Sequence, residues 1–189
     1  MSTPTSDDSL LERIDRGLAS VEAFVVVVDL AIMVGLATMN LILHKLFDAG
    51  FDWADIIVRQ MVLWLGFAGG ALATYEGRHI AIDAVGKFLP PKMAGASRVL
   101  TSVGALVLTG FMFVASIDFV KAEQADGTKL FGEVLAWPFE LIIPASFAAM
   151  GFHFFVAGYK GVLVALGRRA PPAEFDELDH KHGEEEVGS

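Results

Sequence analysis

The sequence predicts an all-α integral membrane protein with four transmembrane helices and a short interfacial helix between the second and the third. Of its 189 residues, 54% are hydrophobic, and the mean hydropathy is +0.54, whereas a soluble domain has roughly 45–50% apolar residues. The apolar residues gather in long runs, and a helix needs about 20 of them to cross roughly 30 Å of hydrocarbon. Membrane lipid is therefore an expected partner.

Each predicted span is an apolar run flanked by polar residues, and the runs cover 23–43, 56–75, 99–120 and 139–163. Helices are expected because lipid offers no partner to an unpaired backbone amide. The chain then divides into a cytoplasmic N-terminal segment, a four-helix transmembrane domain and an acidic cytoplasmic tail, at residues 1–22, 23–166 and 167–189. The tail has too little apolar surface to fold and is expected to be disordered.

Two proline features shape the predicted helices. The residues Ile82, Val85, Phe88 and Leu89 share one helical face, which predicts the short interfacial helix, and Pro90 should end it because proline cannot donate a backbone hydrogen bond. Pro144 lies inside the fourth apolar run, where the same property is expected to kink the helix.

The distribution of basic residues predicts the orientation. An even number of spans puts both termini on one side, and ten of the 14 Lys and Arg residues fall on that side, with four on the other. Positive residues favour the cytoplasm, so both termini are expected there. Trp53 and Trp137 both fall at the predicted outer boundary, where indole rings prefer the headgroup layer.

Composition excludes several classes of function. The net charge of −9 comes largely from acids at the two ends, and no basic cluster suited to nucleic acid is present. The absence of cysteine excludes thiolate chemistry and disulfides. His44, His79 and His153 are predicted at the outer edge, the inner edge and the middle of a span, so no pair is expected to ligate one haem. No catalytic residue, metal or cofactor is expected.

A few charged residues fall within or near the spans, where they are costly and indicate a role. Asp55, Arg59, Asp118 and Glu140 all lie near outer helix ends, which predicts one charge network, with snorkelling to water as the alternative. Asp29 has no second acid or histidine predicted at its depth, so we expect a helix-packing or inter-subunit role for it rather than a proton relay. Polar groups are thus expected at the span edges and not at the midplane, where transporters place their sites.

Small residues mark the second span. Gly66, Gly69 and Gly70 would let another helix backbone approach closely, which predicts helix packing rather than a substrate site. With no matching helix interruption in the two halves of the chain, transport by this chain alone is not expected.

The second span and its exit resemble the small membrane subunit of tripartite ATP-independent periplasmic (TRAP) transporters. The resemblance rests on an acid and an arginine four residues apart (Asp55 and Arg59), a Trp-Leu-Gly run that includes Trp64 and Gly66, a Gly-Arg-His-Ile exit that includes His79 and Asp83, and a following Leu-Pro. It covers about a third of the chain. Two departures are Asp55, where glutamate is commoner, and His44, where arginine often ends the first helix.

The resemblance implies a non-catalytic scaffold in a bacterial inner membrane. Its partners would be a large membrane subunit carrying the sodium and substrate sites and a periplasmic solute-binding protein that delivers a small organic acid. The residues suspected of structural or subunit contacts are Asp55, Arg59, Trp64, Gly66, Gly69, Gly70, His79, Asp83, Asp118, Glu140 and Pro144. The alternatives are the small four-helix subunit of another tripartite carboxylate transporter and the membrane subunit of a redox complex.

Overall fold

The computed structural model describes residues 6–47, 50–86 and 91–166; within these ranges the side chains of residues 6–9, 52, 78–96, 98 and 165 are not described. Four helical stretches are long and apolar enough to cross a membrane, and they are Leu10–Phe47, Trp53–Gly77, Val99–Asp126 and Trp137–Val164. The predicted all-α membrane fold is confirmed. The tail predicted to be disordered, residues 167–189, lies outside the described residues.

The first three spans are single uninterrupted helices. Helix α1 runs over Ser6–Phe47, α2 over Asp52–Gly86 and α3 over Pro91–Asp126. A small antiparallel hairpin follows, formed by β1 (Lys129–Phe131) and β2 (Val134–Leu135). The fourth span consists of the short helix α4 (Trp137–Glu140) and the long helix α5 (Ile142–Ala165).

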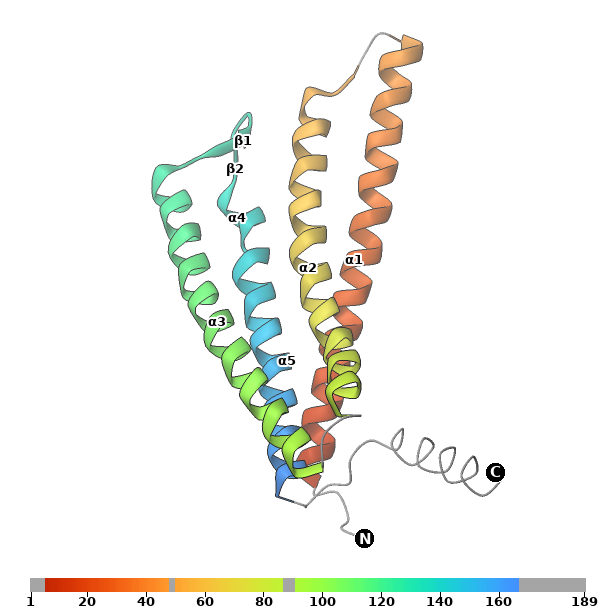
Figure 1. Ribbon diagram of the computed structural model, residues 1–189. Coiled ribbons are helices and arrows are strands. Elements are labelled where there is room, and N and C mark those ends of the chain that lie inside the picture. The colour runs from red at the N-terminus through yellow and green to blue at the C-terminus, as the bar shows by residue number, and fades with distance from the viewer. Residues whose placement is uncertain (1–5, 48–49, 87–90, 167–189) are drawn as a thin grey trace, which may run out of the picture.

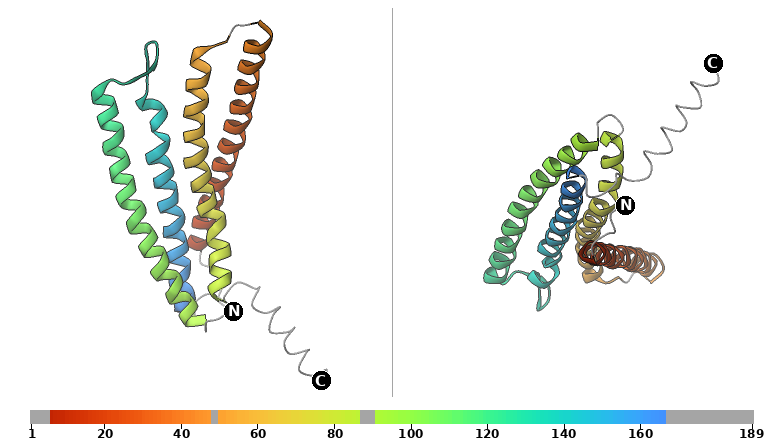
Figure 2. Two further views of the ribbon diagram at one scale, coloured as in Figure 1. Left: turned by 45° about the horizontal axis from the view of Figure 1, so that its top comes forward. Right: turned by 90° about the horizontal axis from the view of Figure 1, so that it is seen from below.

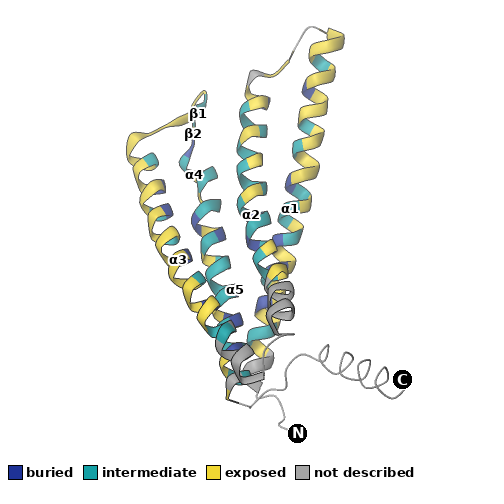
Figure 3. Ribbon diagram, in the orientation of Figure 1, coloured by how far each residue is buried: buried dark blue, intermediate teal, exposed yellow. Residues whose placement is uncertain are grey.

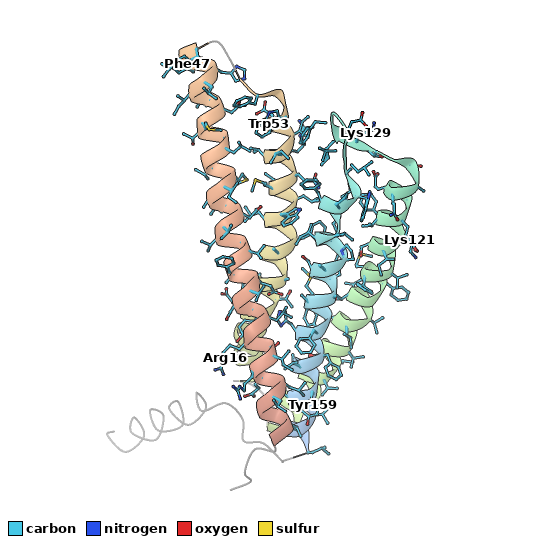
Figure 4. All side chains as sticks on the ribbon, turned by 180° about the vertical axis from the view of Figure 1, so that it is seen from behind. Arg16, Phe47, Trp53, Lys121, Lys129 and Tyr159 are labelled. Atoms are coloured by element: carbon cyan, nitrogen blue, oxygen red, sulfur yellow. The ribbon has the colours of Figure 1, made fainter. Side chains whose placement is uncertain are left out.

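The four long helices lie side by side in one curved layer, in the order α3, α5, α2, α1 (Figures 1 and 2). The start of α1 and the end of α5 lie together, as an even number of spans requires (Figure 1). We call the end of the layer where these two helix ends lie the inner end. The opposite end, which carries the hairpin, is the outer end. Figure 4 labels Arg16 and Tyr159 toward the inner end, and Phe47, Trp53 and Lys129 toward the outer end. A layer leaves much of each helix open on its two faces.

Helix α1 buries four of its polar residues and exposes many of its large apolar ones. Asp15, Glu22, Asp29 and Asn40 are each 8% exposed or less, and Ala19 lies among them. Their spacing places them on one helical face. Large apolar side chains cover the rest of α1, including Phe24 and Val27, and Figure 3 shows the exposed stretches along α1 and α3. Lipid is a suitable solvent for such a surface and water is not.

Small residues let α3 and α5 approach closely. Ser102 and Thr109 of α3 are buried, seven residues apart. A Cβ atom added to Gly158 of α5 would lie 3.2 Å from the Ser102 Cβ, and one added to Gly151 would lie 3.8 Å from the Thr109 Cγ2. The Thr109 hydroxyl donates to the Ala105 carbonyl 2.7 Å away, so its polar group is satisfied within its own helix.

One prediction about helix ends was wrong. The interfacial helix is not a separate element, because α2 continues to Gly86. No residue between the second span and Gly86 lacks a backbone donor, so nothing ends the helix there. Of the residues that predicted the separate helix, Phe88 and Leu89 lie outside the described residues.

Pro144 accompanies the interruption predicted for the fourth span. The break falls at Leu141, between α4 and α5, and Pro144 is the third residue of α5. Proline has no N–H to donate to the carbonyl four residues earlier, here that of Glu140, so the helix is interrupted on the N-terminal side of Pro144.

Candidate functional sites

One face of α2 remains open although α1 and α5 pack on either side of it. Residues spaced four, three, four, three and four apart form this face, which we call the α2 open face: Asp55, Arg59, Val62, Gly66, Gly69 and Ala73. All except Gly69 are exposed, and a Cβ atom added at Gly66 or Gly69 would meet no atom within 4 Å. Five of the six lie within the resembling motif and its helix, where sequence predicted contacts with another subunit.

The charge network predicted at the outer end does not form within the chain. Arg59 makes no ion pair with any described residue. Asp55 instead accepts a hydrogen bond from the Asn40 side-chain amide, 3.2 Å away, and so ties α2 to α1. The Asn40 side-chain oxygen accepts a second hydrogen bond from the Phe51 backbone N–H at 2.9 Å.

The other two members of that predicted network form no ion pair with Arg59 in the described part of the chain. Asp118 belongs to α3, which α5 separates from α2, and it contacts the exposed Lys121 of its own helix at 3.6 Å. The Glu140 Oε2 atom of α4 is buried and has no hydrogen-bond partner in the described part of the chain. The prediction failed because residues at one depth were taken as neighbours, although the layer spreads the helices apart.

Trp64 and Gly70 fix α2 against the fourth span. The Trp64 indole N–H donates to the backbone carbonyl oxygen of Phe139 in α4, 2.7 Å away. Phe67 packs edge to face on Phe147, with ring centroids 5.7 Å apart. A Cβ atom added to Gly70 would lie 3.0 Å from the terminal carbon of Met150. Trp64 and Gly70 are therefore structural within this chain, unlike Gly66 and Gly69.

The exit motif contributes no described contacts. His79 and Asp83 lie in the last turns of α2, but their side chains are outside the described residues. Their suspected structural or subunit role stays a prediction.

A buried acid and histidine cluster joins α1 to α5 near the inner end. Both ring nitrogens of His153 face carboxylates: Nδ1 lies 2.7 Å from the Asp15 Oδ1, and Nε2 lies 3.2 Å from each Glu22 carboxylate oxygen. His153 is fully buried, and Asp15 and Glu22 are 2% and 8% exposed. We call these three residues the acid–histidine cluster.

The surroundings of the acid–histidine cluster extend it over three helices. The Tyr75 ring of α2 packs against the His153 imidazole, with centroids 5.4 Å apart. Glu12 lies on the same face of α1 as Asp15, and its Oε1 atom forms an ion pair with the Lys160 Nζ of α5, 3.2 Å away. The inner end of α1 is thus held to α5 mainly by charged and polar contacts.

His153 lies a little to the inner side of the centre of the fourth span, Trp137–Val164, close to the middle position predicted from sequence. It is 16 residues beyond Trp137, or about 24 Å along a helix. It packs against Tyr75, near the inner end of the second span. The polar cluster therefore lies in the inner half of the helix layer. With both ring nitrogens occupied by carboxylates, His153 is not disposed to ligate a haem iron.

Sequence reasoning missed the acid–histidine cluster because it treated residues 1–22 as a segment outside the membrane domain. The cluster joins residues 138 and 131 positions apart, a separation that no local pattern reports. One usable signal was present: Glu12, Asp15, Ala19 and Glu22 share a helical face that continues into the first span.

Comparison with known proteins identifies the family. The family model for the DctQ component of tripartite ATP-independent periplasmic transporters matches residues 33–163. A TRAP transporter small permease protein of Haemophilus influenzae is 30% identical over 78 residues, covering 41% of this chain and 48% of that protein. The C4-dicarboxylate TRAP transporter small permease protein DctQ of Pseudomonas aeruginosa is 27% identical over 107 residues, covering 54% and 50%.

The chain therefore spans about half the length of these curated relatives. No solved structure matches it. The family match favours neither the redox subunit nor the other carboxylate transporter that the sequence left open. With the match covering most of the membrane domain and all of the α2 open face, the chain belongs to the DctQ component family of tripartite ATP-independent periplasmic transporters.

Proposed function

We propose that this chain is the small, non-catalytic membrane subunit that scaffolds a larger subunit carrying the ion and substrate sites. The assembly lies in a bacterial inner membrane with both termini of this chain in the cytoplasm, and a periplasmic binding protein delivers the solute. The solute is a small organic acid and sodium is the coupling ion. The C4-dicarboxylate description of the Pseudomonas relative supports the solute class, and family membership supports the assembly.

The observation that carries the scaffold role is the state of Arg59. It is exposed on the α2 open face, within a span, and makes no ion pair among the described residues. A charged side chain facing lipid costs about 3 kcal/mol at the centre of a span and less toward its ends. A carboxylate on a helix of the large subunit, at the level of Arg59, would remove that cost.

The glycines on the same face fit this occupant. Gly66 and Gly69 leave space where the Cβ atoms of other residues would be, so the backbone of a partner helix could approach α2 closely. Arg59 and the glycines lie on one face, one to three turns apart, so a single partner helix could meet them all. The α2 open face is therefore the proposed contact with the large subunit.

The test is co-purification of the large subunit with variants of this chain. Gly66→Leu adds bulk to the α2 open face and Gly110→Leu adds the same bulk to α3, and neither position has an atom within 4 Å of an added Cβ. Because neither change meets this chain's own atoms, both variants should fold. Gly66→Leu should lower recovery of the large subunit at least tenfold, and Gly110→Leu should leave it unchanged. Equal recovery with both variants would contradict the assignment of this face.

A second pair of variants tests the charge. Arg59→Ala should lower recovery of the large subunit, because a partner carboxylate would lose its cation. Lys45→Ala removes an exposed cation at the end of α1 and serves as the control. If both variants assembled equally well, Arg59 would be a side chain that reaches water at the outer boundary and not a subunit contact.

A further inference from the structure

The hydrogen-bond geometry of the acid–histidine cluster requires one proton more than its ordinary groups carry. A neutral imidazole has one N–H donor and one nitrogen acceptor. An ionised carboxylate has acceptor oxygens only. Here a carboxylate oxygen faces each ring nitrogen, Asp15 at 2.7 Å and Glu22 at 3.2 Å. A neutral His153 between two carboxylates would leave one contact as two facing acceptors, which repel each other.

We propose that Asp15, Glu22 and His153 form a proton-binding site, in which the proton resides on His153 and fastens the inner end of α1 to α5. The imidazolium then donates from Nδ1 to Asp15 and from Nε2 to Glu22. Both hydrogen bonds are charge-assisted, and such bonds are about twice as strong as neutral ones. The proposal concerns this chain alone and holds whether or not the large subunit binds the α2 open face.

Burial of the cluster raises the free-energy cost of losing the proton. His153 is fully buried and the two carboxylates are nearly so, so water cannot replace a lost contact. Loss of the proton would leave two buried acceptors facing each other in one contact, which is destabilising away from water. That penalty falls on the interface between α1 and α5.

Other titratable groups also lie near the acid–histidine cluster. From α2, the Tyr75 ring packs against the imidazole at a tilt of 58°. From α5, Lys160 pairs with Glu12 of α1 at 3.2 Å, and Tyr159 is its neighbour in the chain. The two contacts of His153 still place a carboxylate oxygen opposite each ring nitrogen. One added proton supplies a donor to both contacts, and we place it on the imidazole because an imidazole is a stronger base than a carboxylate.

The acid–histidine cluster also lies where loss of its proton would change the packing of α1 against α5. Helix α1 is packed along α2 but meets α5 only over a shorter stretch, where the acid–histidine cluster and the Glu12 to Lys160 pair lie. Losing the proton would weaken the first of these two contacts and leave the second. The inner end of α1 would then be held less tightly to α5, while α1 and α2 stay together.

The test is nitrogen NMR of the full chain in lipid nanodiscs, with ¹⁵N-labelled histidine and the His153 signals assigned from their loss in His153→Gln. We expect both ring nitrogens of His153 to read as protonated at neutral pH. In Asp15→Asn the amide can donate to Nδ1, so His153 should become a neutral imidazole that donates only from Nε2 to Glu22. The matched control is Glu12→Gln, which alters the neighbouring acid and should leave both His153 nitrogens protonated.

The same samples report the mechanical consequence. Spin labels on the inner ends of α1 and α5 should give one narrow distance distribution in the wild type and a broader one in Asp15→Asn, with folding checked by circular dichroism. A neutral His153 in the wild type would overturn the proposal. So would a wild-type spectrum unchanged by Asp15→Asn, since the proton would then not depend on the paired carboxylates. Because neither readout uses the large subunit, failure here is distinct from failure of the scaffold role.

Discussion

The Trp64 indole N–H donates to the backbone carbonyl oxygen of Phe139, 2.7 Å away, and so joins the middle of α2 to the short helix α4. The acceptor lies just before the break at Leu141, where the fourth span changes from α4 to α5. A backbone carbonyl near a helix break needs a partner in a low-dielectric surrounding. Trp64 belongs to the motif that resembles the family pattern, and it thus also makes a structural contact between two spans.

Trp64→Phe should destabilise the subunit by about 1 kcal/mol, because it keeps most of the ring and removes one hydrogen bond. Thermal unfolding of the purified chain in detergent measures the effect. Trp53→Phe is the matched control, since Trp53 is 40% exposed and contacts Phe51 and Phe131 through its ring. Equal midpoints for the two variants would show that the Trp64 hydrogen bond contributes nothing.

Gly158→Leu should destabilise the chain by about 1–3 kcal/mol or more, because the added side chain would enter the contact between α5 and α3. An added Cβ atom alone would lie 3.2 Å from the Ser102 Cβ. Gly104→Leu on α3, where an added Cβ meets no atom within 4 Å, should be tolerated. The comparison uses the yield and the unfolding midpoint of each purified variant. A Gly158→Leu protein as stable as Gly104→Leu would mean that α3 and α5 do not pack this closely.

The orientation can be tested with reporter fusions. Alkaline phosphatase is active only after export, so a fusion after Ser189 should be inactive and one near Gly127, in the turn after α3, should be active. The physical reason is the excess of basic residues on the terminal side. The reverse pattern of activity would place the acid–histidine cluster on the periplasmic side and contradict the topology.

Much of the fold followed from the sequence because lipid leaves few choices. Span number, helical structure and the shared side of the two chain ends follow from the length of the apolar runs. The helix ends followed less well: α2 runs on to Gly86, whereas the break at Leu141 follows from the missing backbone donor of Pro144. Hydropathy reports where a helix can lie in lipid, whereas its ends depend on local backbone donors.

The sites followed less well, for a different reason. The motif on α2 directed attention to Arg59 and to the glycines, which the structure leaves open. The acid–histidine cluster escaped prediction because Asp15 and Glu22 were read as part of a solvated segment. Their partner His153 lies 138 positions from Asp15 and 131 from Glu22 in the sequence. Depth along a span can be read from a sequence, but the neighbour of a helix in a layer cannot.

The scaffold role has one direct measurement, solute uptake by proteoliposomes under a sodium gradient. Five preparations are compared, each supplied with a C4-dicarboxylate: this chain alone, the large subunit alone, both subunits, the large subunit with the binding protein, and both subunits with the binding protein. The proposal predicts uptake only in the last, because in the described part of this chain the buried polar cluster is paired internally and α2 offers an open face to a partner. Uptake by this chain alone would contradict a scaffold, and full uptake by the large subunit with its binding protein but without this chain would show that no scaffold is required.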